Sequence, residues 1–354
     1  MPTEPPATEF PVLSVVVIGR NEGDRLARCL ESVEQMRPLH GPIEVIYVDS
    51  ASTDGSLERA AKFNVNVRSL ETANPCASAG RNAGWRIARA PIVFFLDGDT
   101  IVDPDFVADS IAELDDPKVA VVFGNRRELH PDASIYNRAL DLDWIAPPGV
   151  VEFCGGDALI RRDVLARAGG YDERLIAAED TELCGRIRAL GYTVLHVDRP
   201  MVRHDLAITR FSQYWRRALR SGYAYAEVSE RIRRIDLPEW YRQARRNRTQ
   251  GAVMLAIVAG APILSIATRS FVPVLIAIAI IGLLSVRTAI HSRWKNAALA
   301  TRLLHGLHSH LVQIPLLFGQ LKFQLDRSRG RTAELIEYKD APTPIPSKVD
   351  SAPL

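Results

Sequence analysis

The chain has 354 residues, with 44 Lys or Arg against 42 Asp or Glu, so its formal net charge is +2. This small charge gives no strong field toward nucleic acid, and we expect no nucleic-acid partner. The four cysteines (Cys29, Cys76, Cys154 and Cys184) form no CxxC pair, which argues against a zinc site or a disulfide scaffold and fits a reducing compartment.

The N-terminal segment MPTEPPATEF is rich in proline and lacks the basic and apolar regions of a signal peptide, so residues 1–10 are predicted to be a disordered tail. From residue 11, β-branched apolar runs alternate with segments of helical spacing. The expected strands are VLSVVVIG, IEVIYVDS, NVNVRSL, PIVFFLD and VAVVFGNRREL, and the expected helices begin near NEGDRL, TDGSLE, AGRNAG and DPDFVA. This order predicts an α/β domain over residues 11–230, with a mostly parallel, doubly wound sheet and helices on both faces.

Two of the expected helices have clear inner faces. Leu26, Leu30 and Val33 recur at helical spacing in the first helix, and Leu183, Ile187 and Leu190 do so in EDTELCGRIRAL. Asp54 is expected to begin the TDGSLE helix, where a carboxylate caps or interacts with the helix dipole.

The composition changes near residue 230. A basic segment, predicted as a juxtamembrane linker (231–250), leads into two uncharged apolar segments at 251–268 and 271–286. Each is near the length that spans a bilayer, although a buried helical hairpin in a soluble core has the same lengths. Basic residues flank the pair on both outer sides, which by the positive-inside rule places these flanks and the N-terminal domain in the cytoplasm. These residues are Arg242, Arg245, Arg246, Arg248, Arg287, Arg293 and Lys295.

A third apolar stretch, within a membrane region of residues 251–323, differs from the first two. Residues 303–320 contain His305, His308, His310 and Pro315, with no acidic neighbour in the sequence to suggest a metal site. We expect an interfacial or re-entrant helix rather than a third span. Residues 324–354 are predicted to be a polar tail.

Two aspartates follow a buried strand directly in PIVFFLDGDT. If the strand continues briefly, Asp97 and Asp99 project to the same side, and Gly98 between them permits a tight turn or the close approach of a ligand. Converging carboxylates suit a hard divalent cation, Mg²⁺ or Mn²⁺, which takes its other ligands from water and phosphates. A turn that closes the strand explains the same motif without a cation.

Other blocks accompany this motif in a fixed order. They are SVVVIGRNEGDRLARCLESV, IEVIYVDSASTDGS, ASAGRNAGWRIARAPIVFFLDGDT, FCGGDALIRRDVLARAGGYDE, AAEDTELCGRIRALGY and VRHDLAITRFSQYWRRALRSG. Over residues 12–225 the chain resembles the family-2 glycosyltransferases of the GT-A fold. The resemblance implies transfer of a sugar from a nucleotide diphosphate to an acceptor, with inversion at the anomeric carbon and usually with a divalent metal.

The resemblance assigns the donor side by motif. Glu22 matches a residue that holds the nucleoside, and Asp49 one that binds the base; Ser50 stands where many members have a second aspartate, which leaves the base open. Arg81 matches a donor contact near Asp97, although its residue type alone fits an exposed helix position equally well. Asp97 and Asp99 match the family's DxD motif. In this motif Asp97 corresponds to the residue that faces the ribose or the sugar, and Asp99 corresponds to the metal ligand.

The acceptor side follows in the same way. Gly156, after Gly155, matches a position where the backbone approaches a substrate, and Asp157 and Glu179 belong to the same side; a turn and a helix N-terminus explain these residues without a ligand. Asp180 matches the general base, which takes the proton of the acceptor hydroxyl. The helix dipole is expected to keep Asp180 ionised at neutral pH.

Two features near residue 210 extend the site. His204 is a third candidate metal ligand or a structural histidine. In QYWRRALRSG, Arg216 and Arg217 suit a diphosphate or, alternatively, anionic lipid. The segment lacks the QxxRW pattern of processive members, which argues against a polysaccharide polymerase.

Together, these features predict a multi-pass enzyme of the inner (cytoplasmic) membrane with its catalytic domain in the cytoplasm. Its expected partners are a nucleotide-sugar donor and a lipid-linked or glycan acceptor, in the synthesis of the cell envelope or an exopolysaccharide. A polyprenyl-phosphate sugar synthase and an inactive nucleotide-sugar-binding scaffold remain as alternatives. A nucleotidyltransferase is disfavoured because GRNEGDRL is not the Gly-rich basic loop such enzymes carry.

Overall fold

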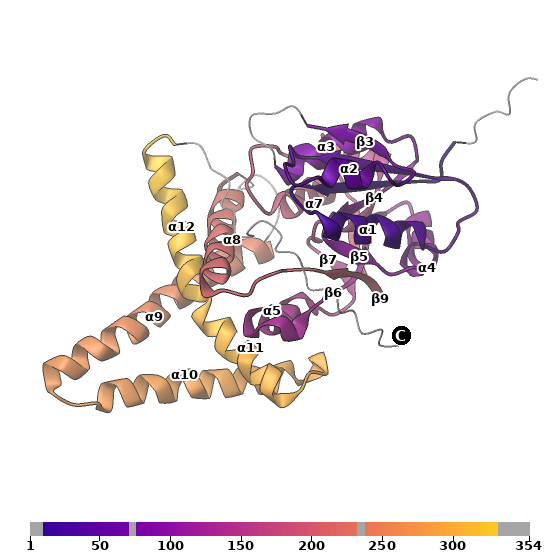
Figure 1. Cartoon of the computed structure of the whole chain (residues 1–354). Helices are drawn as coiled ribbons and strands as arrows, with labels where there is room; N and C mark the ends of the chain where they lie inside the picture. The colour runs from indigo at the N-terminus through magenta and orange to yellow at the C-terminus, as the bar shows by residue number, and fades with distance from the viewer. Residues whose placement is uncertain (1–9, 71–75, 232–237, 332–354) are drawn as a thin grey trace, which may run out of the picture.

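The structure is a computed structural model that describes residues 10–70, 76–231 and 238–331. The expected N-terminal tail, apart from Phe10, lies outside the described residues, as does the expected C-terminal tail from residue 332 onward. Figure 1 shows an α/β domain from which a group of long C-terminal helices extends.

The strands of the α/β domain form one mixed sheet. They are β1 (Leu13–Gly19), β2 (Ile43–Asp49), β3 (Asn66–Ser69), β4 (Ile92–Asp97), β5 (Thr100–Val102), β6 (Val119–Glu128), β7 (Gly149–Val151), β8 (Ala158–Arg161) and β9 (Thr193–His204). Their order is β3-β2-β1-β4-β8-β6-β9-β5, and β7 pairs with β9.

The first half of the sheet has the expected parallel βαβ arrangement. β1 pairs in parallel with β2 and β4, and β2 pairs in parallel with β3, so β1, β2 and β4 all present their carboxyl ends at one edge. The second half departs from a purely parallel sheet, since β8 runs antiparallel to both β4 and β6. The fold is therefore a mostly parallel mixed α/β sheet.

Helices cover both faces of this sheet. Those of the α/β domain are α1 (Asp24–Glu34), α2 (Ser56–Ala60), α3 (Ala77–Ile87), α4 (Phe106–Ser110), α5 (Ile135–Asp141), α6 (Arg162–Arg167) and α7 (Glu179–Ala189), with 3₁₀ turns η1 (Ile111–Asp115), η2 (Pro131–Ala133) and η3 (Leu142–Trp144). One core packs α1 and α4 against the sheet, and a second core packs α6 and α7 against the opposite face. The nearly unbroken apolar strands are explained by burial on both sides.

The predicted helix faces are confirmed with two local differences. Leu26, Leu30 and Val33 are buried, as are Leu183 and Ile187, whereas Leu190 is exposed because the helix ends at Ala189. Asp54 lies before the helix rather than at its start. Its Oδ1 accepts hydrogen bonds from the backbone N (3.1 Å) and the Oγ (2.6 Å) of Ser56, the first helical residue.

The described part of the C-terminal region is mostly helical. It contains α8 (Phe211–Arg231), α9 (Pro238–Thr268), α10 (Val272–His291), η4 (Ser292–Lys295), α11 (Leu299–Leu311) and α12 (Gln313–Ser328). The stretch expected to form a basic linker is helical from Pro238 to residue 250, because α9 continues straight into the first apolar segment. The 303–320 stretch is divided between α11 and α12, with Val312 between them.

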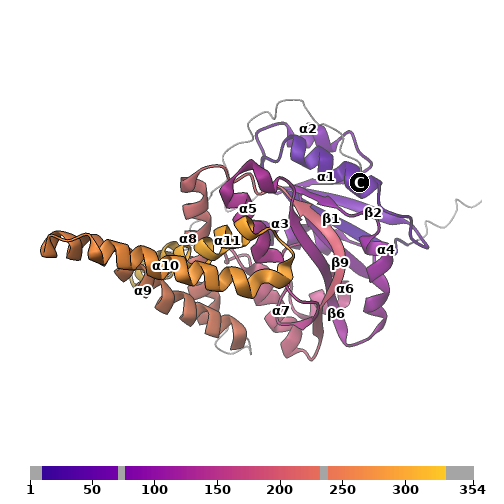
Figure 2. The ribbon, with the colours of Figure 1, turned by 90° about the horizontal axis from the view of Figure 1, so that it is seen from below.

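Two helices project from the rest of the molecule as a hairpin. Figures 1 and 2 show α9 and α10 extending together away from the sheet, joined by a short turn at residues 269–271. Both are long and apolar enough to cross a membrane by length and composition, and only 11% of the apolar window of each is buried. A helical hairpin in a soluble core would be mostly buried. α12, in contrast, packs along α8 and α9.

Candidate active site

A pocket of about 640 Å³ lies at the carboxyl edge of the parallel strands. The ends of β1, β4 and β9 contribute to it, together with the N-terminus of α7 and one side of α8. This is the edge at which open α/β sheets bind ligands. The pocket gathers Glu22, Arg81, Asp97, Asp99, Gly156, Glu179, Asp180, His204 and Arg217 from the residues that the sequence singled out.

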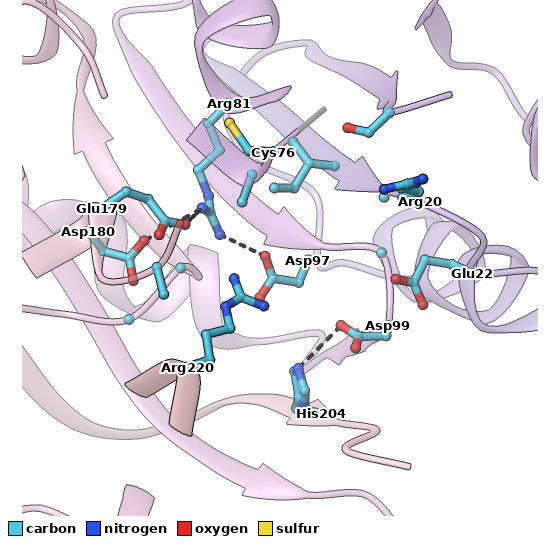
Figure 3. Close-up of a pocket in the computed structure, with 18 of the residues that line it drawn as sticks. Arg20, Glu22, Cys76, Arg81, Asp97, Asp99, Glu179, Asp180, His204 and Arg220 are labelled. Carbon is cyan, nitrogen blue, oxygen red and sulfur yellow. Dashed lines mark hydrogen bonds and ion pairs between the residues drawn. The ribbon is translucent and has the colours of Figure 1, made fainter. Parts of the chain in front are cut away.

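Asp97 is held by two arginines and one backbone contact. Arg81 Nη2 lies 2.7 Å from Asp97 Oδ1, and Arg126 Nη2 lies 3.2 Å from Asp97 Oδ2 (Figure 3 draws the first of these contacts). The backbone N of Asp97 donates to Asp157 Oδ1 at 2.9 Å. The carboxylate is therefore fixed at the end of β4 by opposite charges on both oxygens.

Arg81 is a buried residue of the pocket. It is 2% exposed, which rules out the alternative of an ordinary exposed helix arginine. Its Nη1 lies 2.5 Å from Glu179 Oε1 and 3.5 Å from Asp180 Oδ1, so one guanidinium joins the end of β4 to the start of α7. A planar fork with several fixed donors suits this bridging better than a lysine would.

Gly156 makes the position of Arg81 sterically possible. A Cβ atom at Gly156 would lie 2.2 Å from Arg81 Nη2, far inside van der Waals contact. The expected role of this glycine was to let the backbone approach a substrate; the structure shows that it also leaves room for the guanidinium.

Asp97, Asp99 and His204 form a cluster that fits a divalent cation. One ligand atom from each residue lies within 4.8 Å of the others, the one such cluster found across residues 10–70, 76–231 and 238–331. Asp99 Oδ1 and His204 Nε2 are 3.3 Å apart, and both side chains are nearly buried. Carboxylate oxygens and imidazole nitrogens are suitable ligands for Mn²⁺ and related ions.

The protonation state of His204 also suits a ligand of a divalent cation. Burial, together with the nearby positive charge of Arg126, lowers its pKa well below the usual value, so the imidazole is neutral and has a lone pair to offer. Its Nδ1 is buried and has no hydrogen-bond partner among the described residues. His204 is the last residue of β9.

The structure also contains a turn that closes β4. The Asp-Gly-Asp motif can therefore form this turn and hold a cation at the same time. The backbone N of Gly98 donates to Ile18 O at 2.7 Å, and Thr100 Oγ1 donates to Asp97 O at 2.7 Å. The turn places both aspartates at the pocket.

Asp180 lies at the first turn of α7 and lines the pocket. Burial and the negative charge of Glu179 raise its pKa to about 8, despite the opposing effect of Arg81. Desolvation therefore opposes the helix dipole, which was expected to keep Asp180 ionised at neutral pH.

Two of the predicted site residues, Asp157 and Asp49, do not line the pocket but bind residues next to it. Asp157 has a fully buried side chain, and it accepts a hydrogen bond from Arg126 as well as from the backbone of Asp97. Asp49 is also fully buried, where its oxygens accept from Tyr47 Oη and from the backbone N of Ser52, each at 2.8 Å. Neither is among the residues that line the pocket, whereas Ser50 is.

The arginines of α8 divide between the pocket and the surface. Arg217 lines the pocket, but Arg216 is exposed and lies outside it. Arg220, one helical turn beyond Arg217, also lines the pocket (Figure 3), and its Nη2 donates to Ile176 O at 2.8 Å. The i, i+3 spacing was a signal for Arg220 that the sequence interpretation missed. Arg126, also missed, is placed by β6.

The sequence matches known glycosyltransferase families. The model of the family "Glycosyl transferase family 2" matches residues 14–168, and that of "Glycosyl transferase family group 2" matches residues 92–290.

Two curated relatives agree with these matches. Glycosyltransferase AglE of Haloferax volcanii is 25% identical over 52% of this chain and 64% of its own length. O-antigen chain rhamnosyltransferase RfbN of Salmonella typhimurium is 24% identical over 58% of this chain and 69% of its own length. The chain thus spans slightly less than two thirds of AglE.

A solved structure shares the fold. Mannosyltransferase PcManGT from Pyrobaculum calidifontis, in complex with GDP-Man and Mn²⁺, superposes with a TM-score of 0.62 at 20% identity. The match covers 90% of this chain and 88% of that chain.

Proposed function

The chain belongs to glycosyl transferase family group 2, and we propose that it is an inverting, cation-dependent enzyme that transfers a sugar from a nucleotide diphosphate to a lipid-linked or glycan acceptor. One observation carries the proposal: a carboxylate–histidine cluster and a separate carboxylate, Asp180, face one pocket at the carboxyl edge of the sheet. The likeness to a fold neighbour that holds GDP-Man and Mn²⁺ supports the donor class.

The charge of the pocket suits a nucleotide diphosphate. Six arginines and five carboxylates line it among the described residues, so the side chains leave one net positive charge when all five acids are ionised. Asp97, Asp99 and His204 would hold Mg²⁺ or Mn²⁺. When bound, the cation neutralises the charge that develops on the departing nucleoside diphosphate. Arg217 and Arg220 supply guanidinium groups on the facing helix, and guanidinium geometry matches phosphate.

Asp180 performs the proton transfer in this proposal. Its carboxylate takes the proton of the acceptor hydroxyl while that oxygen bonds to the anomeric carbon and the bond to the diphosphate breaks. A single displacement of this kind inverts the anomeric centre. The raised pKa makes Asp180 a stronger base than an ordinary aspartate, and Arg81 stabilises its ionised form from 3.5 Å.

Glu22 and Asp49 belong to the nucleoside end of the donor. Glu22 lines the pocket at the end of β1, and its Oε2 lies 3.0 Å from Arg25 Nε. Asp49 does not line the pocket. Its carboxylate accepts a hydrogen bond from the backbone N of Ser52, which fixes the turn after β2 with Ser50 at the pocket. Gly156, Asp157 and Glu179 shape the opposite side, around Arg81 and Asp97.

The hairpin α9–α10 is the proposed membrane anchor. Its apolar side chains are exposed along both helices, among them Ile266 at 80% and Leu283 at 72%. The basic flanks on both outer sides support a catalytic domain at the cytoplasmic face of the inner membrane. This location favours a lipid-linked acceptor, for synthesis of the cell envelope or an exopolysaccharide. A polyprenyl phosphate is the alternative acceptor for the same site.

A donor screen with the purified full-length chain tests the proposal. UDP-, GDP- and dTDP-sugars are incubated with Mn²⁺ and a membrane lipid extract, and lipid products are analysed by mass spectrometry. We expect one donor to give a lipid whose mass rises by one sugar residue, and Asp180→Asn to abolish it. An inactive nucleotide-sugar-binding scaffold predicts donor binding without any product.

A further inference from the structure

Trp144 lies immediately behind the proposed cation site. Its ring meets that of His204 edge-on, with centroids 5.4 Å apart and an interplanar angle of 74°. The guanidinium carbon of Arg126 lies 5.3 Å from the centroid of the same indole. One aromatic side chain therefore contacts a candidate ligand of the cation and also the arginine that holds Asp97.

Trp144 also packs against the loop that follows His204. It joins a cluster in which Leu140, Leu206 and Ile208 are buried. Hydrogen bonds tie the same loop to α5: Ile208 N donates to Asn137 Oδ1 at 3.2 Å, and Ser134 Oγ donates to Ile208 O at 2.6 Å. The α5–η3 segment thus fixes the position of the chain on the C-terminal side of His204.

The C-terminal helices hold this segment from its other side. Figures 1 and 2 both show α11 beside α5. His308 Nε2 lies 2.9 Å from Asp143 Oδ2, and His308 Nδ1 lies 2.8 Å from the hydroxyl of Tyr214 on α8. His305 Nδ1 lies 3.2 Å from Ala139 O, and Lys295 Nζ donates to Leu142 O.

These contacts form a continuous path from the helical region to the active site. It runs from His308 on α11 to Asp143, through the chain to Trp144, and from its ring to His204. Neighbours of a metal ligand that fix the orientation of its ring commonly set metal affinity. His204 has no hydrogen bond at Nδ1 among the described residues, so packing orients its ring together with the contact from Nε2 to Asp99 Oδ1 at 3.3 Å.

We propose that Trp144 is a positioning residue for the cation site, and that the Asp143–His308 contact holds it in place, so that docking of α11 sets the affinity for the cation. This inference rests on the proposed function, because it requires Asp97, Asp99 and His204 to bind a cation.

The test measures Mn²⁺ affinity of the full-length chain in detergent, from the electron paramagnetic resonance signal of free Mn²⁺. Trp144→Leu is expected to weaken binding about tenfold, whereas Trp144→Phe, which keeps an aromatic ring, stays within about threefold of the wild type. Asp143→Asn and His308→Gln are each expected to weaken binding about threefold. The double variant should lose less affinity than the product of the two single losses, since the two side chains share one contact.

His310→Gln is the matched control. His310 lies on the same helix, but its Nε2 contacts Thr288 Oγ1 of α10 at 3.1 Å instead of the α5–η3 segment. We expect unchanged Mn²⁺ affinity for this variant. Tryptophan fluorescence gives a second readout: saturating Mn²⁺, which is paramagnetic, should quench the wild type more than Mg²⁺ does, and Trp144→Phe should lose this difference.

The possible results distinguish a failure of the inference about Trp144 from a failure of the proposed cation site. Wild-type affinity in Trp144→Leu, or an equal loss in His310→Gln and His308→Gln, overturns the inference while the cation site stands. If the wild type itself binds no Mn²⁺, both the cation site and the inference are overturned.

Discussion

Arg81 Nη2 and Asp97 Oδ1 lie 2.7 Å apart, which ties the end of β4 to a guanidinium that also contacts the start of α7. This contact joins the donor half of the pocket to the half that carries Asp180. The geometry of the pocket therefore depends on one buried arginine.

Arg81→Lys should lower kcat/KM for sugar transfer at least about 100-fold. A lysine has a single ammonium group, so it cannot contact Asp97 and Glu179 with two separate nitrogens as Arg81 does. Steady-state kinetics with the identified donor measures the change. Activity within threefold of the wild type would show that the bridge between β4 and α7 is dispensable.

Gly156→Ala should be nearly as damaging, because the added Cβ would meet Arg81 Nη2 at 2.2 Å and displace it. Gly155→Ala is the matched control. A Cβ at that neighbouring position would come no closer than 3.9 Å to Arg126 Nη1, so we expect a small effect. Equal activities of the two variants would contradict the steric role assigned to Gly156.

The pH dependence of activity should reflect Asp180. A general base works when deprotonated, so kcat/KM should rise with pH, with an apparent pKa well above the ordinary aspartate value of 3.8 and at most about 8. A bound cation adds positive charge to the pocket and moves this value downward. A profile that is flat from pH 5 to pH 9 would exclude Asp180 as the base.

Asp180→Asn should be inactive but more stable than the wild type at neutral pH. The folded-state pKa of Asp180 is raised, so the folded protein binds the proton more strongly than the unfolded chain does, and stability falls as pH rises from about 4 to about 8. Asparagine lacks this dependence. The difference in Tm, variant minus wild type, should therefore grow across that window; a constant difference would contradict the raised pKa.

Leu283→Lys should weaken membrane association without altering the pocket. Leu283 is 72% exposed on α10, inside one of the two apolar helices. A lysine near the middle of a membrane span costs about 3 kcal/mol in insertion. Fractionation of cells should show less of the variant in the membrane fraction. If its distribution matched that of the wild type, α10 would not be a span.

The sequence predicted the parallel half of the sheet and the placement of Asp97 and Asp99 at the end of β4, because apolar runs and turn residues are local signals. His204 was a candidate ligand or a structural histidine, and the structure places it beside Asp99. It could not predict that Asp157 faces inward, since its donors, Asp97 N and Arg126, come from other parts of the fold. Asp49 is held inward by local donors, Tyr47 and Ser52, which the sequence interpretation overlooked. Arg126 was missed because its role depends on the pairing of β6 with β8. The acidic partner of His308 was also missed, since Asp143 precedes it by 165 residues.

The desolvation of Asp180 is a further property that depends on the tertiary structure. From the sequence, an acid in the first turn of a helix is expected to be ionised. In the folded chain Glu179, Arg81 and burial together determine its pKa, and burial has the largest effect.

The central claim is cation-dependent sugar transfer at the Asp97–Asp99–His204 cluster with Asp180 as the base. Its most direct test is turnover of UDP-, GDP- and dTDP-sugars by the purified wild type, Asp99→Asn and Asp180→Asn, each with Mn²⁺ or with EDTA. We predict turnover of one donor by the wild type with Mn²⁺, loss of that turnover in EDTA, and loss in both variants. Equal turnover with Mn²⁺ and EDTA, or no turnover of any donor, would contradict the claim.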